Sequence, residues 1–356
     1  MTGLAAFLCA CGGGDPTAPP KKDPTLLERA EDYFGLSLRD PAANPMTAAG
    51  IALGRRLFYD PILSGDQTLA CAGCHRQEFA FSDGGNATSR GIHGEFGAVN
   101  TPAIVNPGWS TTFFWNGRAP SLEKQALAPV PNPIEMDLEW NVAIERLEMH
   151  ADYPQLFLGA FGSSDIDSNL VTDAIAQFER TMISIDSRWD KSQRGELSLT
   201  ADEIVGEVLY NREDRGDCFH CHGLGPIFDN SVVPAGPLVF ANNGLDSSPD
   251  AGRFDSTQME SDRGKFKAPT LRNIAMTAPY MHDGRFATLD EVVRFYNTGM
   301  HADSPNMDVK LRGNALAREA ATLPVWTETE ISQFVAFLES LTDSSFLTRA
   351  ELSDPK

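Results

Sequence analysis

Two five-residue stretches, CAGCH and CFHCH, contain the residue types with the clearest chemical potential in this sequence. In each stretch, two cysteines are separated by two residues and followed directly by a histidine, which is the attachment pattern of a c-type haem. Two thiols at this spacing can reach the two vinyl groups of one porphyrin, and the adjacent histidine can ligate its iron. A zinc site would need about four ligands in one local cluster, and a redox dithiol does not need the histidine. The residues that we assign to two covalently bound haem c groups are Cys71, Cys74, His75, Cys218, Cys221 and His222.

Composition and net charge limit the kinds of molecule that this protein is expected to bind. The chain has 356 residues and a formal net charge of −20. This length predicts two domains of ordinary size, with one haem in each. Because the charge is strongly negative, we expect no nucleic-acid partner. A basic protein partner is compatible with the charge, although acidity also serves solubility alone.

The N-terminus contains the two cysteines that the haem motifs do not use. Leu8–Cys11 resembles the cleavage box of a bacterial lipoprotein, with Cys11 as the lipidated residue. We therefore expect a periplasmic protein with a membrane tether at Cys11. The basic residues that normally begin a signal peptide are missing, so the alternative is an unstructured N-terminus without lipid. No later apolar run approaches the ~18–20 residues of a membrane span.

The apolar periodicity and the capping residues predict a mainly α protein with long ordered loops. Residues 76–120 show little periodicity, and we expect them to form loops around a haem. A polar stretch at Ser187–Ser198 separates two predicted domains, 25–188 and 189–356, behind a leader and tether at 1–24. The predicted helices span 26–33, 47–59, 121–127, 139–150, 170–185 and 288–297, with two more that begin after Thr200 and Thr327.

Several longer motifs occur in a fixed order around the two CxxCH stretches. They are VNTPAIVN at 99–106, FFWNGRAPSLEKQAL at 113–127, PIEM at 133–136 and FKAPTLRNIAMTAPYMHDGRFATL at 266–289. In this order the chain resembles the bacterial di-haem cytochrome c peroxidase superfamily, and within it the MauG-like branch, over residues 45–340. The resemblance implies two cytochrome c-like domains. It also implies a peroxide-reacting haem in the first domain and an electron-storing haem in the second.

The resemblance assigns roles to three residues of the first domain. Glu135 matches the acid–base group beside the first haem, Gln125 matches an amide of the same pocket, and Trp115 matches a tryptophan between the haems. Glu135 has apolar neighbours in its turn, and desolvation there would raise its pKa and suit it to move protons. The structural alternatives are a helix-capping Glu135 at the surface and a core Trp115.

The resemblance also implies one Ca²⁺ between the haems. Asn100, Thr277 and Pro279 match the positions that hold it, the last two through their backbone carbonyls. Oxygen ligands suit this cation. Without the resemblance, neutral ligands of this kind give no signal in the sequence.

Tyr296 is the position that separates the branches of the superfamily. It follows the capping box at Thr288, on the face of the predicted helix that carries Val292 and Val293. In conventional members a methionine occupies this position and ligates the second haem, whereas the resemblance to the MauG-like branch implies ligation by Tyr296. A thioether raises the reduction potential of haem, and an anionic phenolate should lower it. The structural alternative is a core tyrosine.

His93 lies near the place where conventional members have a histidine that blocks the first haem. The loop length differs by about one residue, and the alternative is an ordinary surface histidine. Four further tryptophans are candidate exit points for an oxidising equivalent, with a buried core role as the alternative for each: Trp109, Trp140, Trp189 and Trp326.

Three functions follow from these assignments. The first is an H₂O₂-dependent oxidoreductase of MauG type, which stores two oxidising equivalents over two haems and oxidises aromatic side chains of an exported partner protein. The second is a conventional peroxidase that reduces H₂O₂ with electrons from a small cytochrome or cupredoxin, with Met281 or Met300 on the second iron. The third is a di-haem electron carrier without peroxide chemistry.

Overall fold

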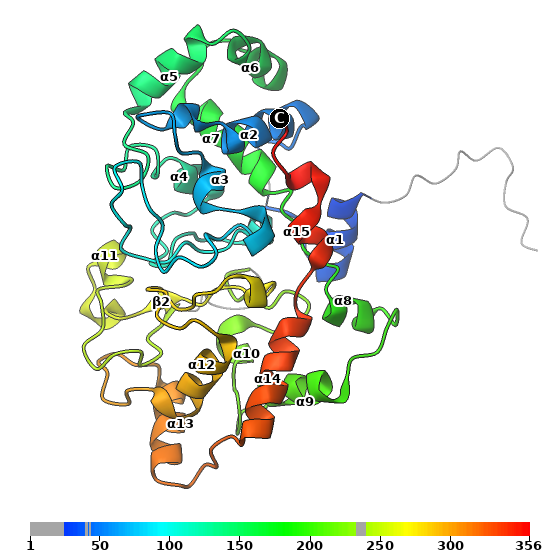
Figure 1. The fold of residues 1–356 in the computed structure, drawn as a ribbon, viewed down its shortest axis with the longest axis vertical. Helices are drawn as coiled ribbons and strands as arrows, with labels where there is room; N and C mark the ends of the chain where they lie inside the picture. The colour runs from blue at the N-terminus through cyan, green and yellow to red at the C-terminus, as the bar shows by residue number, and fades with distance from the viewer. Residues whose placement is uncertain (1–24, 40–41, 43, 233–239) are drawn as a thin grey trace, which may run out of the picture.

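Two helical halves stack along the long axis of the molecule (Figure 1). The computed structural model describes residues 25–39, 42, 44–232 and 240–356. The leader, with Cys9 and Cys11, lies outside the described residues. Helix α3 (Cys71–Cys74) carries the first CxxCH motif in one half, and helix α10 (Phe219–His222) carries the second motif in the other half.

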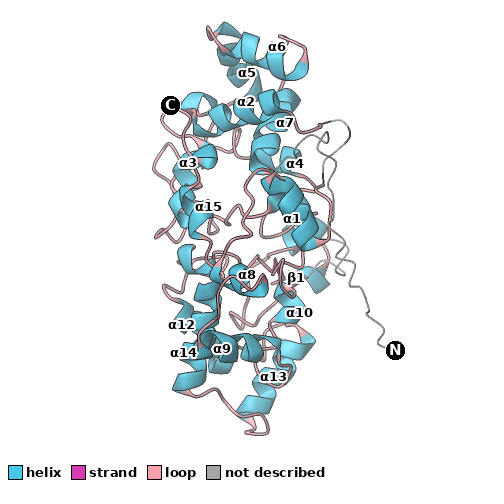
Figure 2. Cartoon of the chain, turned by 90° about the vertical axis from the view of Figure 1, so that its right-hand side faces the viewer, coloured by secondary structure: helices cyan, strands magenta, loops and turns pink. Residues whose placement is uncertain are grey.

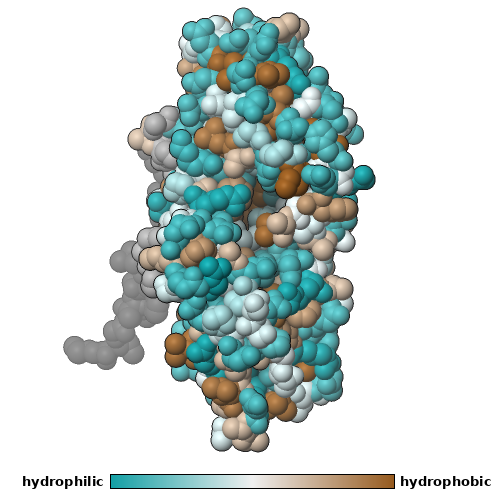
Figure 3. All heavy atoms as spheres, turned by 90° about the vertical axis from the view of Figure 1, so that its left-hand side faces the viewer, coloured by the Kyte–Doolittle hydropathy of each residue, from teal (hydrophilic) through white to brown (hydrophobic). Residues whose placement is uncertain are grey.

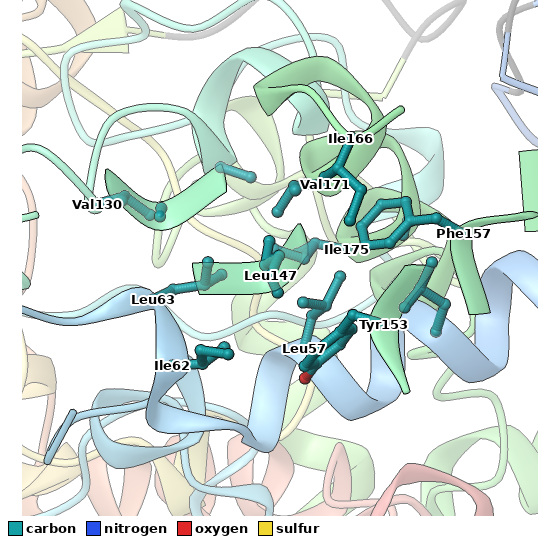
Figure 4. Close-up of a cluster of buried hydrophobic side chains, with 14 of the residues drawn as sticks. Leu57, Ile62, Leu63, Val130, Leu147, Tyr153, Phe157, Ile166, Val171 and Ile175 are labelled. Atoms are coloured by element: carbon teal, nitrogen blue, oxygen red, sulfur yellow. The ribbon is translucent and has the colours of Figure 1, made fainter. Parts of the chain in front are cut away.

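The first half is built on two helices in close contact, α2 (Ala48–Tyr59) and α7 (Ser168–Glu179). Gly54 allows this contact, because a Cβ atom there would lie 1.8 Å from the carbonyl oxygen of Ala174. The adjoining core includes Leu57, Leu147 and Ile175, which point toward one another in Figure 4. The other helices of this half are α4 (Leu122–Ala126), α5 (Trp140–Met149) and α6 (Tyr153–Phe161).

The second half repeats this arrangement with different residues. Helix α9 (Ala201–Asn211) precedes the second CxxCH motif and packs against α14 (Glu328–Ser340). Gly206 allows this contact, because a Cβ atom there would lie 2.1 Å from the carbonyl oxygen of Gln333. In each half, a helix ahead of the haem motif therefore crosses a later helix at a glycine.

The remaining elements are short and lie mainly around these helix pairs. Figure 2 shows that loops make up much of the chain between them. The helices not yet given are α1 (Leu26–Phe34), α8 (Arg188–Gln193), α11 (Phe254–Thr257), α12 (Leu289–Arg294), α13 (Val309–Glu319) and α15 (Ser344–Thr348). The strands β1 (Phe240–Ala241) and β2 (Phe266–Lys267) pair antiparallel. Single 3₁₀ turns lie at Pro61–Leu63, Gln77–Phe79, Pro107–Trp109, Glu260–Asp262, Ile274–Met276 and Ala350–Leu352, and a π-helical turn lies at Phe295–Gly299.

The C-terminal segment returns to the first half. Phe346 of α15 lies edge-to-face on Phe81, with 5.6 Å between the ring centroids. The Tyr59 hydroxyl donates to the carbonyl of Leu352 at 2.6 Å. Figures 1 and 2 both place α15 beside the first half. The domain division at residue 188 stays a prediction, and this segment is a contact across it.

The mainly helical class is confirmed, and most predicted helices agree with the structure to within one or two residues. The helix predicted over 170–185 is wrong at its end, since α7 stops at Glu179. Beyond it, the backbone N–H groups of Ile185 and Asp186 donate to Asp343 at 3.1 and 3.0 Å, so tertiary partners replace helical ones. The predictions also missed the longer helices α6 and α13 and the short helices α8, α11 and α15. The side of the molecule shown in Figure 3 is mainly hydrophilic. No described helix has the length and apolarity to span a membrane.

Candidate haem cavity

A cavity of about 410 Å³ is lined by residues from both halves of the molecule. Its walls include Cys74 and His75 of the first motif and Cys218, Cys221 and His222 of the second. Cys71 is not a lining residue and packs at the edge of the cluster that holds Phe58 and Phe81. The predicted residues Trp115, Gln125, Glu135 and Tyr296 line the same cavity, as do Asn100, Thr277 and Pro279. Tertiary folding thus brings together residues that lie far apart in the sequence.

Both motif histidines are oriented in the same way. The Nδ1 of His75 lies 2.7 Å from the carbonyl oxygen of Phe81, and the Nδ1 of His222 lies 2.8 Å from that of Pro269. A carbonyl can only accept, so Nδ1 carries the proton and the lone pair of Nε2 is left for a metal. Burial lowers the pKa of both histidines and favours this neutral form.

The cysteines fit attachment to haem better than redox chemistry. One helical turn places Cys71 and Cys74 on one side of α3, because residues three apart are neighbours on a helix. Burial raises the pKa of Cys71 to about 12 and that of Cys74 to about 11. A redox dithiol needs a lowered thiol pKa instead. The neutral Nε2 atoms and the paired thiols together suit a haem in each half.

Glu135 lies on the first-half side of the cavity. The Asn132 amide donates to its Oε1 at 2.6 Å. Burial raises the pKa of Glu135, while the Asn132 hydrogen bond and the charge of Arg118 oppose the rise. A carboxyl whose pKa is raised by burial is suited to exchange protons with a bound substrate. Gln125 and Arg118 line the cavity beside it.

Trp115 connects the two halves. Its indole Nε1 donates to the carbonyl of Asn100 at 2.7 Å, and its own carbonyl accepts from the backbone N–H of Lys267 at 2.7 Å. Lys267 belongs to β2 of the second half. These two hydrogen bonds hold Trp115 at the wall of the cavity that both motifs share.

The three residues of the expected calcium site, Asn100, Thr277 and Pro279, all line the cavity. The Asn100 amide nitrogen donates to Ala87 at 3.0 Å, which leaves the side-chain oxygen as an acceptor. The Thr277 hydroxyl donates to the carbonyl of Ile274 at 3.1 Å, and the resemblance assigns the backbone carbonyl of Thr277 as its ligand to the cation. Neutral oxygens fit Ca²⁺, and the site stays a prediction.

Tyr296 lies in the π-helical turn that follows α12. Such turns are rare, and they frequently occur at functional sites. The Asn243 amide donates to the Tyr296 hydroxyl oxygen at 3.1 Å and lies 3.6 Å from the Met281 sulfur. Burial raises the pKa of Tyr296, and the Asn243 hydrogen bond opposes the rise. The phenol oxygen and the thioether sulfur therefore flank one amide, and both residues line the cavity with His222.

Two further histidines, His93 and His282, each bond to an aspartate side chain. His93 is exposed, lies outside the cavity lining, and bonds to Asp137 at 2.7 Å. His282 stacks on Phe266 with 3.7 Å between the ring centroids and bonds to Asp250 at 3.0 Å.

Sequence reasoning missed Arg118 and Asn243. Arg118 lies within the FFWNGRAP stretch that carried the resemblance, so that motif was the available signal. Nothing in the sequence around Asn243 marks it.

Comparison with known proteins assigns this geometry to a family. Residues 48–198 match the family model of the di-haem cytochrome c peroxidases. The methylamine utilization protein MauG of Methylorubrum extorquens is 33% identical over 347 residues, which are 95% of this chain and 91% of that protein. The cytochrome c peroxidase Ccp of Escherichia coli K12 is 38% identical over 273 residues, which are 75% of this chain and 58% of that protein.

A solved structure agrees over nearly the whole chain. The crystal structure of a MauG-like protein associated with microbial copper homeostasis is 36% identical and has a TM-score of 0.80, with 96% of this chain and 99% of that chain covered. The chain therefore belongs to the di-haem cytochrome c peroxidase family, and it is an oxidoreductase. Membership implies two haems, H₂O₂ as substrate, and a protein partner or electron donor.

Proposed function

We propose that this protein is a peroxidase of MauG type, which removes electrons from aromatic side chains of an exported partner protein in the periplasm. Tyr296 carries the proposal, since it lines the same cavity as His222. A phenolate oxygen on the second iron would lower its reduction potential and allow that site to hold an oxidising equivalent. Haem, when bound, supplies the redox chemistry with peroxide.

The residues of the first half would handle protons and orientation. Glu135, with its raised pKa, would take the proton from one peroxide oxygen and deliver it to the departing oxygen. Gln125 would orient the peroxide by hydrogen bonding. Arg118 would support the anionic form of Glu135, because its positive charge opposes the rise in the Glu135 pKa.

The residues between the halves would connect and rigidify the two sites. Trp115 would carry electrons between them, and its hydrogen bond to Asn100 fixes the indole for that role. A Ca²⁺ ion held by Asn100, Thr277 and Pro279 would fix the same region. We also propose the domain division at residue 188, with one haem on each side.

Peroxide titration of the diferric protein tests the proposal. A MauG-type enzyme is expected to form a long-lived state two electrons above the diferric state, without any added electron donor. Rapid return to the diferric state, or no reaction, would contradict it.

The alternative is a conventional peroxidase supplied with electrons by a small cytochrome or cupredoxin. One observation favours it: the Met281 sulfur lies 3.6 Å from the amide that binds Tyr296, so a thioether is available at the same place. Fast turnover with reduced cytochrome c, together with the absorption band of methionine-ligated haem, would support this alternative.

A further inference from the structure

Trp189 differs from the other tryptophans in the partner of its indole. Its Nε1 donates to Oε1 of Glu207 at 2.8 Å. An ionised carboxylate only accepts hydrogen bonds, and it can also accept the proton itself. Because an indole becomes strongly acidic when it loses an electron, a carboxylate at Nε1 makes that loss easier.

The other four tryptophans, all in the described part of the chain, lack such a partner. The indoles of Trp109, Trp115 and Trp140 donate to backbone carbonyls, which are poor bases. The Nε1 of Trp326 has no hydrogen-bond partner among the described residues, and the Arg318 guanidinium lies 5.1 Å from its ring centroid. A cation above the ring opposes a positive charge on it.

A continuous set of aromatic rings leads from the haem cavity to Trp189. Tyr210 lines the cavity, and its ring centroid lies 5.8 Å from that of Phe228. Phe228 lies edge-to-face on Trp189 at 4.8 Å. Electron tunnelling weakens steeply with distance and is fastest through closely packed atoms. The two short ring contacts therefore favour electron transfer between the cavity and Trp189.

Trp189 is only 6% exposed, but it lines a pocket that opens to the surface. Trp189, Glu207 and Leu224 line a surface pocket of about 360 Å³, and Leu224 is 59% exposed. Gly225 makes room for the indole, because a Cβ atom there would lie 2.2 Å from the Trp189 ring. The indole therefore lies between the second-haem side of the cavity and solvent.

We propose that Trp189, with Glu207 as its proton acceptor, relays electrons from the partner protein to the second haem. The inference rests on the proposed function and names its exit site. Trp189 gives one electron to the oxidised haem, and its Nε1 proton moves to Oε1 of Glu207. An aromatic side chain of a partner at the surface pocket returns one electron, and the proton moves back to Nε1. Two such passes remove two electrons from the partner and regenerate both residues.

Mapping of self-oxidation tests the relay in the holoprotein. One equivalent of H₂O₂ is added without a partner protein, and peptide mass spectrometry locates oxygen that dissolved dioxygen adds to the resulting tryptophan radical. The oxidised protein is expected to carry oxygen at Trp189. Trp189→Phe should abolish that label and extend the lifetime of the oxidised state several-fold. Glu207→Gln keeps a hydrogen-bond acceptor but not the base, and it should lower the label at Trp189 several-fold.

Trp109→Phe is the matched control, and it should behave like the wild type in both measurements. The relay is wrong if oxygen appears on another tryptophan while Trp189 stays unmodified, or if Glu207→Gln leaves both the label and the lifetime unchanged. The resting absorption spectrum reports whether each variant keeps its haems, and Glu207→Gln provides the test if Trp189→Phe does not fold. If the wild type forms no long-lived oxidised state, the proposed function itself fails, and the relay fails with it.

Discussion

The two CxxCH sites hold their motif histidines in the same way, but they differ in the other residues that surround them. In each, a backbone carbonyl holds Nδ1 of the motif histidine, at 2.7 Å for His75 and 2.8 Å for His222. The first site has a carboxyl with a raised pKa, Glu135, near it. The second site has two candidate iron ligands, Tyr296 and Met281, around Asn243. The shared histidine arrangement suits a haem at each site, and the proposed function assigns peroxide activation to the first site and charge storage to the second.

The largest effect is expected when the two haem-attaching cysteines of one site are removed while the other site is left intact. Cys71→Ala with Cys74→Ala should lower the haem content from two per chain to one and abolish the reaction with H₂O₂, because the proposed function places the acid–base residue Glu135 at the first site. Cys218→Ala with Cys221→Ala should lower the content equally but leave a peroxide reaction without a long-lived product. Haem content and peroxide-induced absorbance changes measure both effects. A peroxide reaction that survives in the first variant would reverse the assignment.

Glu135→Gln tests the acid–base role of the first site. Loss of a positioned proton-transfer group should lower the rate constant of the peroxide reaction by about 10²–10⁴-fold. Burial raises the pKa of Glu135, and only the carboxylate can take the peroxide proton. The wild-type rate should therefore fall as the pH falls through this raised pKa, and the variant should lose that dependence.

Glu148→Gln is the control, since Glu148 is exposed on α5 in the same half. Equal rate constants of the peroxide reaction for the Glu135 and Glu148 variants would show that Glu135 is not the acid–base group.

Tyr296→Met would give the second site the methionine that conventional di-haem peroxidases have at this position. Axial ligands set haem potentials over ~0.8 V, and a thioether should raise the potential of the second haem by on the order of 0.1 V. Spectroelectrochemistry measures this shift, and the long-lived oxidised state should disappear in parallel. Met281→Leu is the companion variant: if it, rather than the Tyr296 variant, changes the potential, the conventional alternative is correct.

Asn243→Leu is the mildest test of the comparison. It removes the hydrogen bond to the Tyr296 oxygen, which is worth about 0.5–1.5 kcal/mol. The resting spectrum should show a partial shift away from tyrosine ligation, because the donor that stabilises the phenolate is gone. An unchanged spectrum would show that Asn243 does not tune this ligand.

Local patterns explain why so much of the helical structure was predictable. Thr200, Thr288 and Thr327 each begin a helix with both hydrogen bonds of a capping box. These interactions involve neighbours three residues apart, so they can be recognised in the sequence. The early end of α7 could not be predicted, because the chain beyond it bonds to distant residues: the Ser184 N–H donates to Asn106, and the Ile185 N–H donates to Asp343, 158 residues further on.

The sequence by itself determined the cofactor motifs, the helical class and the family resemblance, since each depends on residue types at short, fixed spacings. Only the tertiary structure placed Trp115, Glu135 and Tyr296 at one cavity, gave Tyr296 its π-helical turn, and set Trp189 against Glu207. The physical reason is that desolvation, hydrogen bonding and ring contact depend on distance in space, and spacing along the chain does not set that distance for residues on separate elements.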